Sequence, residues 1–181
     1  MHRFFLNRTI KKHIRGNNRK KQFVNLSKAK SILLLFECEE STNQVINEII
    51  SQLSTLGKTV FSIGFEKGGE EESTSQTKII GKKDINFLKM PKNDVLQEFT
   101  NQRFDLLLDL TASENISMLY VALFANATMK ASSHTAHSEI FDFILDLENL
   151  IGGRKVEDFK NYERFLFAKM IFYLKTIQTS D

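Results

Sequence analysis

The feature that most constrains the fold is an unbroken apolar run at residues 31–36, Ser-Ile-Leu-Leu-Leu-Phe. A strand with one face in water alternates apolar and polar side chains, whereas a strand covered on both faces does not. After this run, apolar residues recur at helical spacing over residues 45–56, Gly57 stands where a helix would end, and residues 59–65 form a second strand pattern. Residues 31–65 therefore predict a β-α-β unit with a right-handed crossover.

The rest of the chain continues the alternation of strands and helices. Further strands are predicted at residues 104–110, 128–132 and 140–145, and further helices at 93–102, 114–126 and 156–177. Weaker patterns at residues 78–80 and 84–88 predict ordered structure of unassigned type. This order predicts the α/β class, with a Rossmann-like, mostly parallel and doubly wound sheet. In the last helix, one apolar stripe is formed by Phe159, Leu166, Met170, Tyr173 and Ile177, widened by Phe165 and Phe172. We expect this stripe to face the core, with a homodimer surface as the alternative.

The charge of the chain is divided unevenly along its length. The first thirty residues carry ten Lys and Arg and no Asp or Glu, whereas the remaining 151 carry 15 basic and 22 acidic side chains. In this segment Leu6, Ile10 and Ile14 recur at a four-residue spacing before Gly16, which predicts a short basic helix followed by a linker. We therefore expect a basic arm at residues 1–30 and a single α/β domain at residues 31–181.

A dense basic segment without acids is typical of a surface that binds a polyanion. In the first interpretation, the arm contacts RNA, with possible association with the ribosome. Phosphate contacts would then come from Arg8, Lys11, Lys12, Arg15, Arg19, Lys20 and Lys21. Two alternatives remain open: the basic amphipathic helix lies on an anionic membrane, or it packs its apolar side on the body.

Acidic residues follow two of the predicted strands. Glu37, Glu39 and Glu40 come at the end of the first strand, and Asp109 lies near the end of a later one. These carboxylates are candidate ligands for a divalent cation, and with Lys130 they are similar to the acidic site of receiver domains. They would repel a phosphate, and no glycine-rich loop follows the first strand, so a nucleotide site is disfavoured. The simpler interpretation is a solvated helix start that acids stabilise.

Cysteine and histidine offer little further chemistry. Cys38 is the only cysteine and stands among acids that would raise the pKa of its thiol, so we expect a buried strand-end residue. His134 and His137 have a helical metal-binding spacing but no third ligand in sequence, which favours a polar loop. No cofactor is expected.

Apolar runs are too short for a membrane span of about 18 residues, and the N-terminal apolar cluster is too short for a secretory signal. With one cysteine, the chain fits a reducing compartment. We expect a cytoplasmic protein, although the acid-free start is also similar to a mitochondrial transit peptide.

From residue 25 onward, the order of short motifs resembles an uncharacterised α/β family of Bacteroidetes-type bacteria. The motifs are Asn25-Leu26, Ala29-Lys30-Ser31-Ile32, Gly57-Lys58, Phe104-Asp105-Leu106-Leu107, Leu119-Tyr120, Ala127 with Lys130, and Phe141-Asp142. They are hydrophobic and structural, so the resemblance implies a fold and no catalytic residue.

A more distant likeness is to the N-terminal half of heptosyltransferase-like glycosyltransferases. It rests on the strand of the Phe-Asp-Leu-Leu type, the helix after it and an Ala-x-x-Lys element. A glycine usual in those enzymes is replaced here by Ala131-Ser132, and 181 residues leave no room for the domain that binds the nucleotide sugar. The likeness therefore implies a shared core without the active site.

Three functional hypotheses follow, in order of preference. The first is a non-enzymatic binding module whose arm contacts RNA while the body packs on a neighbouring protein. The second is a small enzyme or metal-dependent domain that uses the acidic strand ends. The third is a membrane-peripheral protein.

Overall fold

The computed structural model describes residues 1–16, 21–38, 42–66, 74, 76–152 and 161–176. Its centre is a six-stranded sheet in which every strand pair is parallel and the order is β3-β2-β1-β4-β5-β6. The strands are β1 (Ser31–Cys38), β2 (Thr59–Glu66), β3 (Thr77–Ile80), β4 (Arg103–Asp109), β5 (Asn126–Ser132) and β6 (Phe143–Ile144). This is the strand order of dinucleotide-binding Rossmann domains, so the predicted fold class is confirmed.

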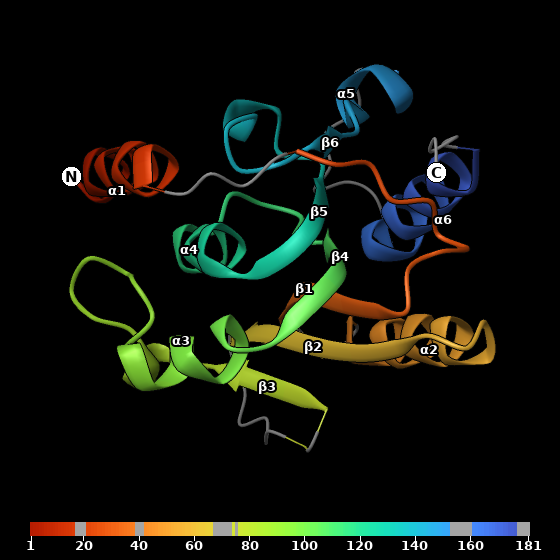
Figure 1. Ribbon diagram of the computed structural model, residues 1–181, viewed down its shortest axis with the longest axis horizontal. Coiled ribbons are helices and arrows are strands. Elements are labelled where there is room, and N and C mark those ends of the chain that lie inside the picture. Colours follow the sequence, from red (N-terminus) through yellow and green to blue (C-terminus); the bar gives the residue numbers. More distant parts are fainter. Residues whose placement is uncertain (17–20, 39–41, 67–73, 75, 153–160, 177–181) are drawn as a thin grey trace.

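Helices cover both faces of the sheet (Figure 1). They are α1 (His2–Gly16), α2 (Thr42–Thr55), α3 (Asn93–Thr100), α4 (Ile116–Phe124), α5 (Leu147–Leu150) and α6 (Tyr162–Thr176). Buried side chains of α2 and α6 form one core with the sheet, and those of α1, α3 and α4 form the other. The chain is therefore a three-layer α/β sandwich.

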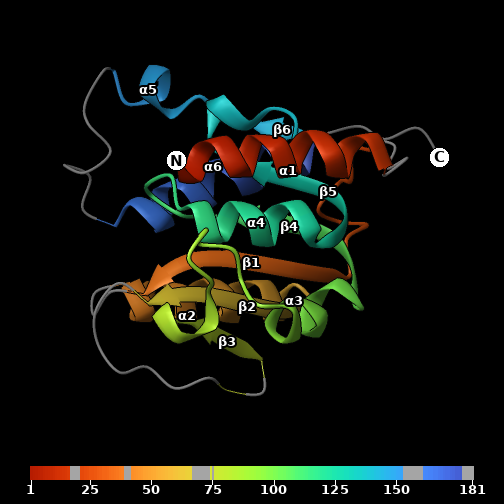
Figure 2. The ribbon, with the colours of Figure 1, turned by 90° about the vertical axis from the view of Figure 1, so that its left-hand side faces the viewer.

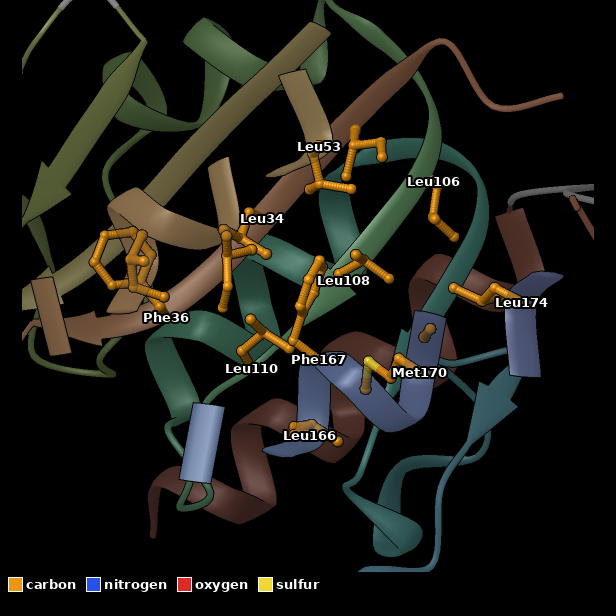
Figure 3. Packing of buried hydrophobic residues seen from close by; sticks show 14 of the residues in the cluster. Leu34, Phe36, Leu53, Leu106, Leu108, Leu110, Leu166, Phe167, Met170 and Leu174 are labelled. Carbon is orange, nitrogen blue, oxygen red and sulfur yellow. The ribbon is translucent and has the colours of Figure 1, made fainter. Parts of the chain in front are cut away.

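The core beneath α2 and α6 explains why the sequences of β1 and β4 are continuous apolar runs. Leu34 of β1 and Leu106 and Leu108 of β4 are fully buried against this layer, where they meet Leu166 and Met170 of α6 (Figure 3). The intervening residues of both strands point to the opposite core. Both faces of the central strands are thus apolar, as the sequence predicts.

Helix α2 ends in the manner that Gly57 predicts. Gly57 has φ +73°, and the N–H groups of Gly57 and Lys58 donate to the carbonyls of Ser54 and Leu53. These two bonds form a Schellman motif, which satisfies carbonyls that the helix leaves free. Ser41, the residue before α2, lies outside the described residues.

Several predicted boundaries differ from the structure. Around the weak pattern at residues 84–88, Lys82–Asp84 is a 3-10 turn and Ile85 makes an isolated antiparallel bridge with Pro91. The strand predicted at 140–145 shortens to β6. Helix α4 begins at Ile116 rather than residue 114, because the Asn115 side chain caps it by accepting from the N–H groups at positions 117 and 118.

The apolar stripe of α6 also differs from the prediction. Phe167 and Leu174 are buried together with Leu166 and Met170, whereas Phe172 is 63% exposed and Tyr173 is 36% exposed. Residues 156–160 and 177 of the predicted helix lie outside the described residues. The error has a simple cause: with aromatic residues all around the helix, periodicity does not decide which side is buried.

Helix α1 packs beside α4 (Figure 2). Arg3 bonds to Glu114, just before α4, and the His13 ring meets the ring of Phe124 at its end, so the two helices run parallel. Residues 133–142, which connect β5 to β6, contain one 3-10 turn and no α-helix. Helix α1 therefore covers a part of the sheet that a crossover helix would cover in a regular β-α-β repeat.

Candidate functional site

The first candidate site is the outward face of α1. Leu6 and Ile10 are buried against the body, with exposed fractions of 0% and 3%. Because successive residues are about 100° apart around a helix axis, the opposite face carries Phe4, Asn7, Arg8, Lys11, Lys12 and Arg15. All six are exposed and together they line one open depression. We call these six residues the basic face of α1.

The four cations of the basic face are not neutralised by the body. Within the described part of the chain, the side chains of Arg8, Lys11, Lys12 and Arg15 make no ion pair and no hydrogen bond. An exposed cation without an acidic partner keeps its full charge for a ligand.

The other predicted arm residues differ in position. Lys21 extends toward the loop between β5 and β6, where its Nζ donates to the carbonyls of Ser138 (2.9 Å) and Phe141 (3.3 Å). Arg19 and Lys20 lie outside the described residues. The basic face thus contains four of the seven residues predicted to contact phosphate.

The start of α1 is anchored to the body by charge. The Arg3 guanidinium bonds to both oxygens of Glu114, at 2.8 and 2.6 Å, and His137 Nε2 lies 3.4 Å from Glu114 Oε2. Burial opposes the charge of Glu114, but the bond from Arg3 and the nearby imidazole outweigh it and lower the pKa of this carboxyl. The carboxylate therefore remains charged at neutral pH and holds Arg3.

The second candidate site lies at the carboxyl ends of β1 and β4, the topological switch point where Rossmann domains bind ligands. Glu37 and Asp109 lie near the ends of these two neighbouring strands, with exposed fractions of 3% and 1%. Glu39 and Glu40 lie outside the described residues. We call Glu37, Asp109 and the polar side chains that bond to them the strand-end cluster.

Asp109 is held by donors from within the protein. Its Oδ1 accepts from the N–H (3.1 Å) and hydroxyl (2.8 Å) of Thr111, and its Oδ2 accepts from Ser132 (3.2 Å). His134 Nε2 lies 2.7 Å from the Thr111 hydroxyl and 3.6 Å from Asp109 Oδ2. The lone pairs of this buried carboxylate are thus directed to protein groups.

Glu37 lies beside the start of α4. Its carboxylate accepts from Ser113 (3.2 and 3.3 Å) and from the Asn115 amide (3.4 Å), the residue that caps α4. A helix start is where a phosphate would bind in a nucleotide site. Here a buried carboxylate lies next to that position and would repel it.

Tyr162 of α6 lies near the strand-end cluster without bonding to its carboxylates. Burial raises the pKa of its phenol, and the negative charges of Asp109 and Glu37 raise it further. The hydroxyl therefore stays protonated and bonds to Ser133 at 2.8 Å.

These positions do not support a cation site or a receiver-like acidic site. Within the described residues, no group of three His, Cys, Asp or Glu side chains is placed to hold a metal ion. His134 faces Asp109 and His137 faces Glu114, so the two histidines do not form one ligand pair. Cys38 is buried at the end of β1, as predicted.

The Lys130 side chain bonds to the end of α4 rather than to the acidic side chains. Its Nζ donates to the carbonyls of Ala122 (2.6 Å) and Leu123 (3.1 Å), at the end of α4. A receiver domain needs this lysine at its acidic site, whereas here it satisfies helix carbonyls.

Sequence reasoning named Glu37, Asp109 and the four cations of the basic face as candidates, but it did not name the side chains that bond to the two carboxylates. These are Thr111, Ser113, Asn115 and Ser132. A usable signal was present: polar residues stand at or within a few residues of the ends of β4 and β5, and carboxyl ends of neighbouring parallel strands meet at one edge.

The fold and these sites define a Rossmann-like α/β domain with a docked basic N-terminal helix. The chain belongs to a family of unknown function, DUF6913, whose family model matches residues 2–176. The match includes α1 as well as the sheet. No curated protein and no solved structure matches the chain, so the likeness to glycosyltransferases gains no support. Among the described residues, no helix is both long enough and apolar enough to cross a bilayer.

Proposed function

We propose that the protein is a non-enzymatic, cytoplasmic RNA-binding module, with ribosomal RNA among its candidate partners, and that the basic face of α1 makes the contact. The observation that carries the proposal is the arrangement of Arg8, Lys11, Lys12 and Arg15. They share one exposed face of a helix whose opposite face is buried in the core. A rigid row of cations suits a row of phosphates, because binding releases counterions without first ordering the helix.

Charge distribution favours α1 over the rest of the surface. Residues 31–181 carry seven more acidic than basic side chains, so the body repels a polyanion. RNA that approaches the molecule would therefore be drawn to α1.

A membrane is less favoured because of how α1 is docked. An interfacial helix buries its apolar face in the lipid, and its affinity grows with the apolar area it inserts. In this chain Leu6 and Ile10 are already buried against the body. The face that remains exposed is mainly charged.

The enzyme alternative is disfavoured by the strand-end cluster itself. Its two carboxylates bond to Thr111, Ser132, Ser113 and Asn115, all of them groups of the protein. Such a satisfied polar network fits a structural role at the switch point.

Fluorescence anisotropy with a labelled RNA at several salt concentrations tests the proposal. For a single strand, the slope of log K against log salt is about 0.7 per phosphate contact, which gives a magnitude of about 3 for four cations. The double variant Lys11→Gln/Lys12→Gln should lower that magnitude by about 1.4 and weaken binding roughly ten-fold or more at about 0.1 M salt. Glutamine keeps the helix propensity of lysine, so α1 should still form.

The matched control is Lys82→Gln/Lys83→Gln. It removes the same charge from two exposed lysines in a turn on the body. We expect it to leave affinity and salt slope near those of the unchanged protein. Equal losses in both double variants would show that only net charge matters and would refute the site. Binding to phosphatidylserine vesicles without binding to RNA would replace the proposal with the membrane alternative.

A further inference from the structure

Phe4 is an unusual member of the basic face. Its side chain is 67% exposed, although burial stabilises a phenylalanine side chain and Leu6 and Ile10 of the same helix are buried. It lies one turn before Arg8 and lines the same depression as the four cations. An apolar ring placed at the end of a cationic row offers a second kind of contact to a polyanion.

The position of the ring is supported from two sides. The Phe5 ring meets it edge to face, with centroids 5.7 Å apart. The preceding residue, Arg3, bonds to Glu114 of the body and fixes this turn of α1. An aromatic side chain that is already oriented loses little entropy when a flat ligand packs on it.

We propose that the RNA recognised by α1 is unpaired at the contact, and that one base stacks on the Phe4 ring while Arg8, Lys11, Lys12 and Arg15 hold the phosphates beside it. This inference rests on the proposed function and specifies its substrate class. In a duplex the base faces are covered by their neighbours, whereas in single strands and loops they are free to stack on aromatic side chains. The base identity matters little for such a contact, because every base has a π-face.

A single-stranded oligouridylate and a blunt RNA duplex of the same length are the probes. Replacing a stacking aromatic residue by alanine weakens affinity by about 5-fold to about 160-fold. Phe4→Ala should therefore weaken binding of the single strand by at least about five-fold and leave duplex binding nearly unchanged. Phe4→Leu should behave like Phe4→Ala, because leucine is apolar but has no π-face.

The control is Phe87→Ala, which removes a ring that is 79% exposed on the body. It should not change the affinity for either probe. If Phe4→Leu restores full affinity, or if Phe4→Ala weakens both probes equally, stacking is excluded. If the basic face did not bind RNA at all, the result would differ from these outcomes. Lys11→Gln/Lys12→Gln would then leave the affinity for both probes unchanged.

Phe4→Trp supplies an independent readout. The chain contains no tryptophan, so the fluorescence of this variant reports on position 4 alone. We expect its emission to be quenched by the oligouridylate and to change little with the duplex, at matched saturation of binding. Emission that responds only to phosphatidylserine vesicles would overturn the proposal in favour of a membrane contact.

Discussion

At the scale of single residues, Lys130 shows that a side chain can make contacts other than those its sequence motif suggests. Its position in the predicted strand downstream of the Asp109-Leu110 pair is similar to that of the receiver-domain lysine. In the fold it is 3% exposed and its Nζ bonds to two carbonyls at the end of α4. Sequence spacing gives the strand that carries the lysine, but it does not give the direction of a four-carbon side chain.

Lys130→Met tests this role. Methionine keeps most of the apolar stem but removes the donor, so the carbonyls of Ala122 and Leu123 lose a buried partner. An unsatisfied buried group costs about 1–3 kcal/mol, so we expect the free energy of unfolding to fall by that amount. Urea denaturation followed by circular dichroism measures it. Lys83→Met, on an exposed turn, is the control and should stay within about 0.5 kcal/mol; equal losses would show that Lys130 does not support α4.

At the scale of elements, the docking of α1 depends on Glu114, and the lowered pKa of this carboxyl makes the docking dependent on pH. A carboxyl with a lowered pKa in the folded protein contributes stability above its ordinary pKa, about 4.3 for glutamate. That contribution disappears as the pH falls through the lowered value. The attachment of the first turn of α1 is therefore present at neutral pH and lost in acid.

Hydrogen exchange of the α1 amides measures this attachment. At pH 7, Glu114→Gln should reduce their protection by a few-fold, since a mostly exposed ion pair contributes at most about 1 kcal/mol. Below about pH 4 the protection in the unchanged protein should approach that of the variant. Glu98→Gln, which removes a partner of Lys78, is the control and should leave α1 unaffected. A pH-independent difference between the proteins would show that Glu114 does not act through its charge.

The elements also show what periodicity can and cannot predict. The strands β1, β2 and β4 were predicted nearly to the residue, because central parallel strands are apolar on both faces and bounded by turn residues. The edge strand β6 was predicted too long, since Phe141 and Leu145 are buried without belonging to the sheet. Burial and strand formation coincide in the middle of a sheet and separate at its edge.

At the scale of the whole molecule, the sequence predicted a sheet with a basic arm, and it left packing of the arm on the body as one of three alternatives. Leu6 and Ile10 join the core formed by α3, α4 and the sheet, and Leu26 donates its N–H to the carbonyl of Leu174 in α6. Such contacts join residues far apart in the chain, and α1 lies where a crossover helix between β5 and β6 would otherwise pack. Local patterns do not contain that information.

The structure therefore predicts that α1 unfolds together with the sheet. Ile10→Ala removes a side chain that is 3% exposed and should lower the global free energy of unfolding by about 2–5 kcal/mol. Ile14 lies one turn later on α1 and is 43% exposed, so Ile14→Ala is a matched control that should cost less than about 1 kcal/mol. Chemical denaturation, followed by circular dichroism and by tyrosine fluorescence, compares the two variants.

Coincident transitions and a lower midpoint only for Ile10→Ala would show that residues 2–16 and the α/β sheet form one cooperative unit. If Ile10→Ala changes only the exchange of α1 amides and leaves the midpoint unchanged, α1 is instead an arm that detaches on its own. The distinction bears on RNA binding as well. A helix that shares the stability of the domain presents its cations and Phe4 without an ordering cost, whereas a detachable arm would lose affinity in proportion to the time it spends free.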